Sequence, residues 1–163
     1  MLPLTEKEIR SSLINVSLKE RSTLTLPEDF ADRRWADLDY LGWRDRKIPN
    51  IGYVVVELDG APTGLLLRQA ETKPRSRAQC SWCEDVHLPN EVVFFGAKRT
   101  GQAGRNGNTV ATLVCSNFEC SANVRKRPPV AYVGFDVEAA REKRMIALGE
   151  HVRSFVRDVR DSR

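Results

Sequence analysis

All four cysteines of the 163-residue chain lie between residues 80 and 120, in two close pairs. Cys80 and Cys83 form a C-x2-C pair, and Cys115 and Cys120 form a C-x4-C pair further along the chain. A short spacer lets one tight turn direct both sulfurs at one ion, and zinc takes four tetrahedral ligands. The spacing therefore predicts one structural zinc ion (Zn2+) with no open coordination position. Free buried cysteines or a redox pair are the alternatives.

The segments around the cysteines predict a treble-clef zinc finger. Residues 90–99 and 108–114 are rich in β-branched and aromatic residues and predict two strands, and a short helix follows Cys120. The predicted order is a tight turn that carries the first cysteine pair (a zinc knuckle), then a hairpin, then the second pair at the start of a helix. This is the order of elements in a treble clef. A unit this small has little core, so bound zinc supplies folding free energy. The glycine-rich segment 100–107 between the strands favours a mobile loop.

The N-terminal part of the chain predicts helices and a β-hairpin. Thr5 and Glu8 form a capping box before a helix over about 6–18. Residues 26–43 begin with a Leu-Pro dipeptide that suits a first helical turn, and they predict a short helix. Two apolar runs flank Asp59-Gly60, a dipeptide typical of tight hairpin turns.

The C-terminal part predicts one long helix over residues 137–160, which Asp136 can cap. Its apolar stripe consists of Val137, Ala140, Leu148, Val152, Phe155 and Val159. We therefore expect an α+β protein. Residues 1–72 would form a small N-terminal region of helix and β-hairpin, and residues 73–163 would form the treble-clef zinc-finger domain with the long C-terminal helix.

Positive charge gathers around the cysteines. The net charge is +4, and residues 73–127 carry nine Lys and Arg against four Asp and Glu. This excess suits contact with RNA or an acidic protein face, although a solvated surface explains it equally well. No apolar stretch is long enough to span a membrane, and the N-terminus does not have the pattern of a secretory signal. We therefore expect a cytoplasmic protein without membrane contact.

The motifs C-x2-C, FFGAKRTG, GN and C-S-N-F-x-C-S, over about residues 75–128, resemble a known family. They are similar to the C-terminal treble-clef zinc finger of elongation-factor-G-binding proteins, which include the FusB-type fusidic-acid resistance proteins. The preceding residues look more like those of short actinobacterial proteins that carry this finger. The resemblance implies a non-enzymatic protein that binds elongation factor G and promotes its release from the ribosome.

In that family, exposed aromatics and a lysine of the finger contact the factor, and the resemblance places this contact on several residues here. A thin finger buries one face of a strand, so either Phe94 or Phe95 is expected outside, and Phe118 is expected at the exposed centre of a knuckle turn. Cations beside an exposed aromatic are typical of a binding hot spot. The expected partner-binding residues are Phe94, Phe95, Lys98, Arg99, Arg105 and Phe118.

Catalytic motifs are missing from the sequence. It contains no nucleophile elbow, phosphate-binding loop of the Walker type or H-E-x-x-H motif, so we expect a protein that is not an enzyme. The two histidines, His87 and His151, are expected outside the zinc shell and at the surface. The alternative function is a zinc-finger module that binds ribosomal RNA, and a third is a module whose partner is unrelated to translation. We expect a monomer.

Overall fold

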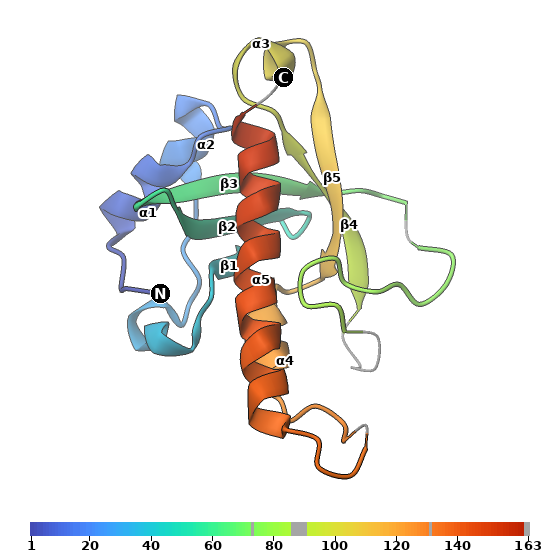
Figure 1. Cartoon of the computed structure of the whole chain (residues 1–163). Coiled ribbons are helices and arrows are strands. Elements are labelled where there is room, and N and C mark those ends of the chain that lie inside the picture. The colour runs from blue at the N-terminus through green and yellow to red at the C-terminus, as the bar shows by residue number, and fades with distance from the viewer. Residues whose placement is uncertain (73, 86–90, 131, 162–163) are drawn as a thin grey trace.

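The computed structural model describes residues 1–72, 74–85, 91–130 and 132–161. These residues form the expected α+β fold around a five-stranded antiparallel sheet of order β1-β2-β3-β4-β5 (Figure 1). The strands are β1 (Leu41–Arg44), β2 (Ile51–Leu58), β3 (Ala61–Gln69), β4 (Val92–Lys98) and β5 (Thr109–Cys115).

The sheet separates two cores. Successive side chains of a strand point to opposite faces, and the run Val54-Val55-Val56 shows the consequence. Val54 and Val56 belong to the core beneath helix α5 (Val137–Arg160), whereas Val55 belongs to the core beneath helix α1 (Glu6–Ser12). Figure 1 shows α5 crossing the sheet, with α1 at its side. Burial on both faces explains why these strands read as continuous apolar runs.

The predicted hairpins are confirmed. Asp59 and Gly60 both have positive φ, 53° and 81°, as a tight turn between antiparallel strands requires. In the finger, β4 pairs with β5 from Val92↔Cys115 to Lys98↔Thr109. The short helix after the second cysteine pair is α4 (Cys120–Arg125).

The single helix predicted over 6–18 is wrong. Helix α1 ends at Ser12, where Ile14 leaves the helix and donates its N–H to the Gly64 carbonyl oxygen at 3.0 Å. A second capping box, formed by Ser17 and Glu20, then starts helix α2 (Leu18–Thr23). The chain therefore uses residues 13–17 to reach the sheet between two short helices.

The short helix predicted within 26–43 is also wrong. Two 3-10 turns, Phe30–Asp32 and Trp35–Asp37, occupy this segment and lead into β1. Pairing with β2 stabilises the end of this segment as strand β1 and not as a helix. Trp43 stacks on its cross-strand partner Tyr53 with ring centroids 5.0 Å apart.

Residues 100–107 contain a short helix, α3 (Gly101–Arg105), so the prediction of a mobile loop is wrong. The hydroxyl of Thr100 donates to the Arg160 carbonyl oxygen at 2.6 Å, which ties this turn to the end of α5. Gly104 lets α3 fold back tightly on the end of β4, since a Cβ there would lie 1.8 Å from the Arg99 carbonyl oxygen. Tertiary contact thus orders a segment whose composition alone favours a loop.

The long C-terminal helix and its Asp136 cap are confirmed. Leu148, Val152 and Val159 of the predicted stripe are buried, together with Val156, whereas the stripe residues nearer the helix start are only half-buried. None of the helices in the described part of the chain has the length and apolar content needed to cross a membrane.

One sheet runs through both predicted regions of the chain. Strand β3, before residue 73, pairs with β4, after it, over the three residue pairs from Leu67↔Ala97 to Gln69↔Phe95. Core residues from both regions also contact one another beneath α5. The division at residues 72 and 73 stays a prediction about the organisation of the chain.

Replacing Leu148 with alanine should lower the free energy of unfolding by about 3 kcal/mol, because it leaves a cavity where α5 meets the sheet. Ile146 lies on the same helix but is 56% exposed, so Ile146→Ala should change stability by less than about 0.5 kcal/mol. Urea unfolding of both variants measures the difference. Equal stabilities would contradict the packing of α5 on the sheet.

Candidate metal centre and partner-binding surface

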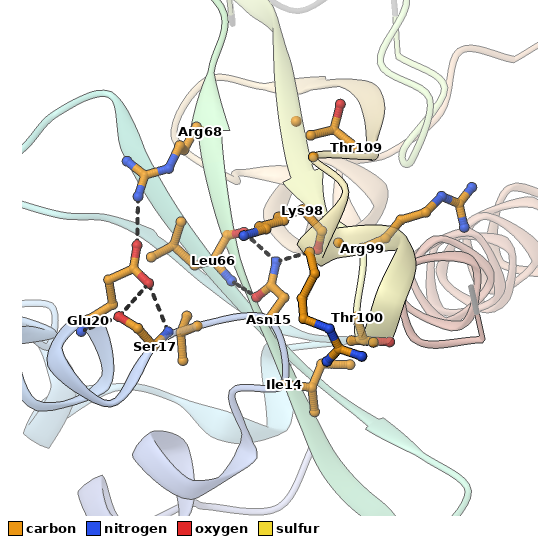
Figure 2. A pocket seen from close by; sticks show the side chains of 16 residues that line it. Ile14, Asn15, Ser17, Glu20, Leu66, Arg68, Lys98, Arg99, Thr100 and Thr109 are labelled. Carbon is orange, nitrogen blue, oxygen red and sulfur yellow. Dashed lines mark hydrogen bonds and ion pairs between the residues drawn. The ribbon is translucent and has the colours of Figure 1, made fainter. Parts of the chain in front are cut away.

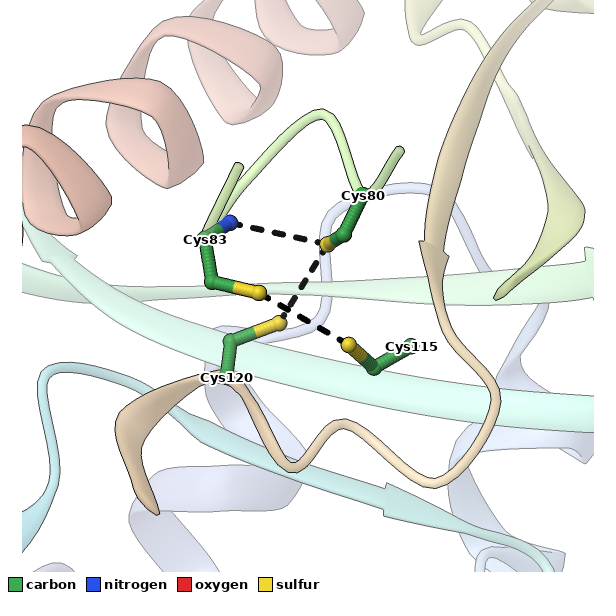
Figure 3. Close-up of side chains that lie close together, drawn as sticks. All are labelled: Cys80, Cys83, Cys115 and Cys120. Carbon is green, nitrogen blue, oxygen red and sulfur yellow. Dashed lines mark hydrogen bonds between the residues drawn. The ribbon is translucent and has the colours of Figure 1, made fainter. Parts of the chain in front are cut away.

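The four cysteines lie close together (Figure 3), within the core that also contains the buried residues of α5. Cys80 and Cys83 flank a tight turn, the knuckle, while Cys115 ends β5 and Cys120 begins α4. All four sulfurs are buried and lie within 4.8 Å of one another, with Cys80–Cys120 at 3.6 Å and Cys83–Cys115 at 3.7 Å. Zinc–sulfur bonds of about 2.3 Å in a tetrahedron place sulfurs about 3.8 Å apart. The donor set therefore fits one structural zinc.

N–H groups around the centre favour the thiolate form of its ligands. The Asn123 amide nitrogen lies 3.5 Å from the Cys115 sulfur, and the Cys83 backbone N–H points at the Cys80 sulfur at 3.5 Å. Hydrogen bonds from Cys115 and Cys120 also hold the pKa of Cys80 well below its usual range, whereas hydrogen bonding to Cys115 and Cys80 raises the pKa of Cys120. Zinc binding needs all four thiolates, so it must release the protons that the cluster retains.

The knuckle is held from two sides. Ser81 donates its N–H to the Leu113 carbonyl oxygen of β5 at 2.8 Å. On the other side, His151 of α5 donates Nδ1–H to the Trp82 carbonyl oxygen at 2.9 Å. His151 is half-buried, with a side chain that is 36% exposed, so it is only partly solvated. His87 lies outside the described residues. The metal site is thus fixed to the edge of the sheet and to α5.

Phe118 lies inside the protein, and the expectation that it is exposed is wrong. Its φ is +60° and its side chain is only 6% exposed. The ring fills a slot left by two glycines, because a Cβ on Gly42 or on Gly52 would lie 2.6 Å from a Phe118 carbon. Tyr40 closes the contact by donating its hydroxyl to the Phe118 carbonyl oxygen at 3.2 Å. The Phe118 side chain is therefore a core residue that packs the finger against strands β1 and β2.

The other predicted partner-binding residues divide between two places. Phe95 is fully buried, which excludes it from a surface contact, and Phe94 is the half-exposed member of the pair. Lys98 and Arg105 are exposed, whereas Arg99 is half-buried and forms an ion pair with Asp158 at 3.0 Å. The three cations line one cavity of about 650 Å³, and Phe94 lines a separate groove of about 490 Å³.

This second groove, which we call the β5 groove, also contains apolar residues outside the expected partner-binding set. Trp82 of the knuckle, Leu113 of β5 and Phe155 of α5 line it together with Phe94. Trp82 is buried, with its ring centroid 5.7 Å from that of Phe155. The aromatic residue between the first two ligands is a sequence signal for Trp82, but the convergence of β5 and α5 requires the three-dimensional fold.

Replacing any one of the four cysteines with serine should abolish stable zinc binding and unfold the finger, because three thiolates leave the site open and the buried hydroxyl is a poor ligand. Metal analysis of the purified protein should give one zinc per chain for the wild type. Ser116→Ala, beside a ligand but not one of them, is the matched control. A metal-free wild-type protein with an intact fold would contradict the assignment.

Substitutions at the Phe118 slot should destabilise the fold from either side. Phe118→Ala should cost about 3 kcal/mol by leaving a cavity, and Gly52→Ala should cost about 1–3 kcal/mol by overfilling the slot. Thermal unfolding compares both with Gly60→Ala, whose new methyl group meets nothing within 4 Å but whose φ of +81° adds backbone strain. The double variant Gly52→Ala/Phe118→Leu should regain stability relative to Gly52→Ala, a result that backbone strain alone would not give.

Comparison with known proteins places these features in a family. A search of curated proteins found no match. Among solved structures, the fusidic acid resistance protein FusC matches with a TM-score of 0.49 and 20% identity, over 65% of this chain and 47% of that one. This chain therefore spans about half the length of that protein. The model of the FBP C-terminal treble-clef zinc-finger matches residues 8–159, well beyond the segment that carries the cysteine motifs. The chain belongs to the FBP C-terminal treble-clef zinc-finger family.

Proposed function

We propose that this protein binds translation elongation factor G through its zinc finger and promotes the release of that factor from the ribosome. The observation that carries the proposal is the family match over residues 8–159. The protein would act in the cytoplasm as a monomer and without catalysis, since four thiolates leave the zinc no open position for a substrate.

The β5 groove supports this proposal as the anchor site. Phe94 and Leu113 are cross-strand partners on the two finger strands, and both are half-buried. Strand β5 is the last strand of the sheet, and Ala111, which also lines the groove, is exposed. A partly exposed aromatic side chain in an apolar groove is the kind of residue that anchors a binding hot spot.

Rigidity of the groove favours binding. The zinc ligands, the Ser81–Leu113 hydrogen bond and the His151–Trp82 hydrogen bond fix both walls before a partner arrives. A preformed surface loses little conformational entropy on association, so more of the contact free energy appears as affinity. The zinc thus contributes to binding through structure alone.

Phe94→Ala should weaken binding to elongation factor G by about 2 kcal/mol, as the loss of a hot-spot aromatic does. Calorimetry with the zinc-loaded protein and the factor from the same host measures the affinity. Leu18→Ala removes a side chain that is 82% exposed on α2, away from the groove, and should leave the affinity unchanged. Zinc content and melting temperature should stay at wild-type values in both variants.

Binding of ribosomal RNA is the second candidate function, and the basic excess over residues 73–127 favours it. RNA binding weakens steeply with salt because phosphate contacts release counterions, whereas an aromatic-anchored protein contact weakens less. If the zinc-loaded wild type shows no binding to the factor at micromolar concentrations but a salt-dependent affinity for ribosomal RNA, the factor-binding proposal is wrong.

A further inference from the structure

Strands β3 and β4 diverge after their short region of pairing. Beyond Leu67↔Ala97, the side chain of Asn15 takes the place of the next backbone hydrogen bonds. Its amide nitrogen donates to the Leu66 carbonyl oxygen at 2.9 Å and to the Lys98 carbonyl oxygen at 3.2 Å, and its oxygen accepts from the Leu66 N–H at 2.9 Å. Figure 2 shows Asn15 between the two strands.

This divergence opens the larger of the two cavities described above, which we call the fork cavity. Its walls come from residues 14–17, from the diverging strands and from α3 with its flanking residues, and its volume is about 650 Å³. Sites for small molecules are typically about 300–1,000 Å³. Ile14, Val16 and Leu66 give it an apolar wall. The cavity is therefore large enough for a ligand with both a charged and an apolar part.

The fork cavity carries more positive than negative charge. Its lining includes four cations, Arg68, Lys98, Arg99 and Arg105, and one carboxylate, Glu20. The backbone N–H of Ser17 lowers the pKa of Glu20, so this carboxylate is ionised at neutral pH and pairs with Arg68 at 2.7 Å.

Two of the four cations in the fork cavity remain without a carboxylate partner. Arg68 pairs with Glu20, and Arg99 pairs with Asp158 at 3.0 Å. Lys98 and Arg105 are exposed and form no ion pair within the part of the chain that the structure describes. Two positive charges from different elements, β4 and α3, thus face one cavity uncompensated.

We propose that the fork cavity binds the phosphate group of a small phosphorylated ligand of about mononucleotide size. A phosphate monoester carries close to two negative charges and three acceptor oxygens, which match the two uncompensated cations. A carboxylate carries one charge and would leave one cation unmatched. Lysine binds phosphate as a point charge and arginine through its planar fork, while the apolar wall would contact the organic part. This site is distinct from the β5 groove and goes beyond factor binding.

The test uses the full-length, zinc-loaded protein with three probes: pyrophosphate, adenosine monophosphate and a short single-stranded oligouridine. Calorimetry at constant ionic strength gives affinities, and amide chemical shifts locate the site. We expect pyrophosphate and adenosine monophosphate to bind and to shift amides of residues 14–17 and 96–105. The double variant Lys98→Gln/Arg105→Gln should weaken both by at least about tenfold, since it removes two charge-assisted contacts.

The matched control is Arg127→Gln/Lys143→Gln, which removes the same charge from two exposed residues outside the cavity. It should leave the affinities unchanged. An equal loss of affinity in both double variants would show that net charge alone causes the effect, and it would overturn the proposal. Failure of both small probes to bind at millimolar concentration also overturns it. If oligouridine alone binds, and Lys98→Gln/Arg105→Gln weakens it, the ligand is RNA and the small-ligand proposal is wrong.

Phe94→Ala separates this proposal from the one on factor binding. Phe94 lines the β5 groove and not the fork cavity, so this variant should bind adenosine monophosphate with wild-type affinity. Loss of phosphate binding in Phe94→Ala would indicate a shared site and overturn the assignment to the fork cavity. The outcome of the factor-binding experiment does not alter this comparison.

Discussion

The bonds from four thiolates to one zinc ion are the constraint on which the rest of the structure depends. They join the knuckle, the end of β5 and the start of α4, three segments that have no continuous secondary structure between them. Once these segments are joined, Trp82 lies under α5 and Phe118 lies against β1 and β2. The metal therefore organises the core as well as the finger, and it holds in place the knuckle that forms one wall of the β5 groove.

The metal centre was predictable because ligand spacing is a local property of the sequence. The hairpins and α5 were predictable for the same reason, through the Asp59-Gly60 turn and the Asp136 cap. The break after α1 was also readable, since the Ser17–Glu20 capping box is present in the sequence next to the Thr5–Glu8 box. The apolar pattern alone predicts one helix, whereas the second capping box marks the start of a new one.

The remaining features depend on residues that are distant in the sequence. The inward direction of Phe118 requires the glycine slot of β1 and β2, which is formed more than sixty residues earlier. The helix α3 requires the end of α5, and the divergence of β3 and β4 requires Asn15. Local composition does not encode these contacts. The glycine-rich segment 100–107 therefore indicates a loop, and Phe118 between two cysteines indicates an exposed binding residue, when each is considered by its composition alone.

The packing of Phe118 between the finger and strands β1 and β2 affects how long the protein survives in the cell. Because this ring completes the core under β1 and β2, loss of zinc frees a side chain on which the N-terminal strands also depend. We therefore expect the damage to extend beyond the finger, so that a metal-free chain would expose apolar strands from both halves of its sheet to proteases. The cellular amount of the protein would then follow the supply of zinc, so that metal starvation removes the protein itself along with its binding activity.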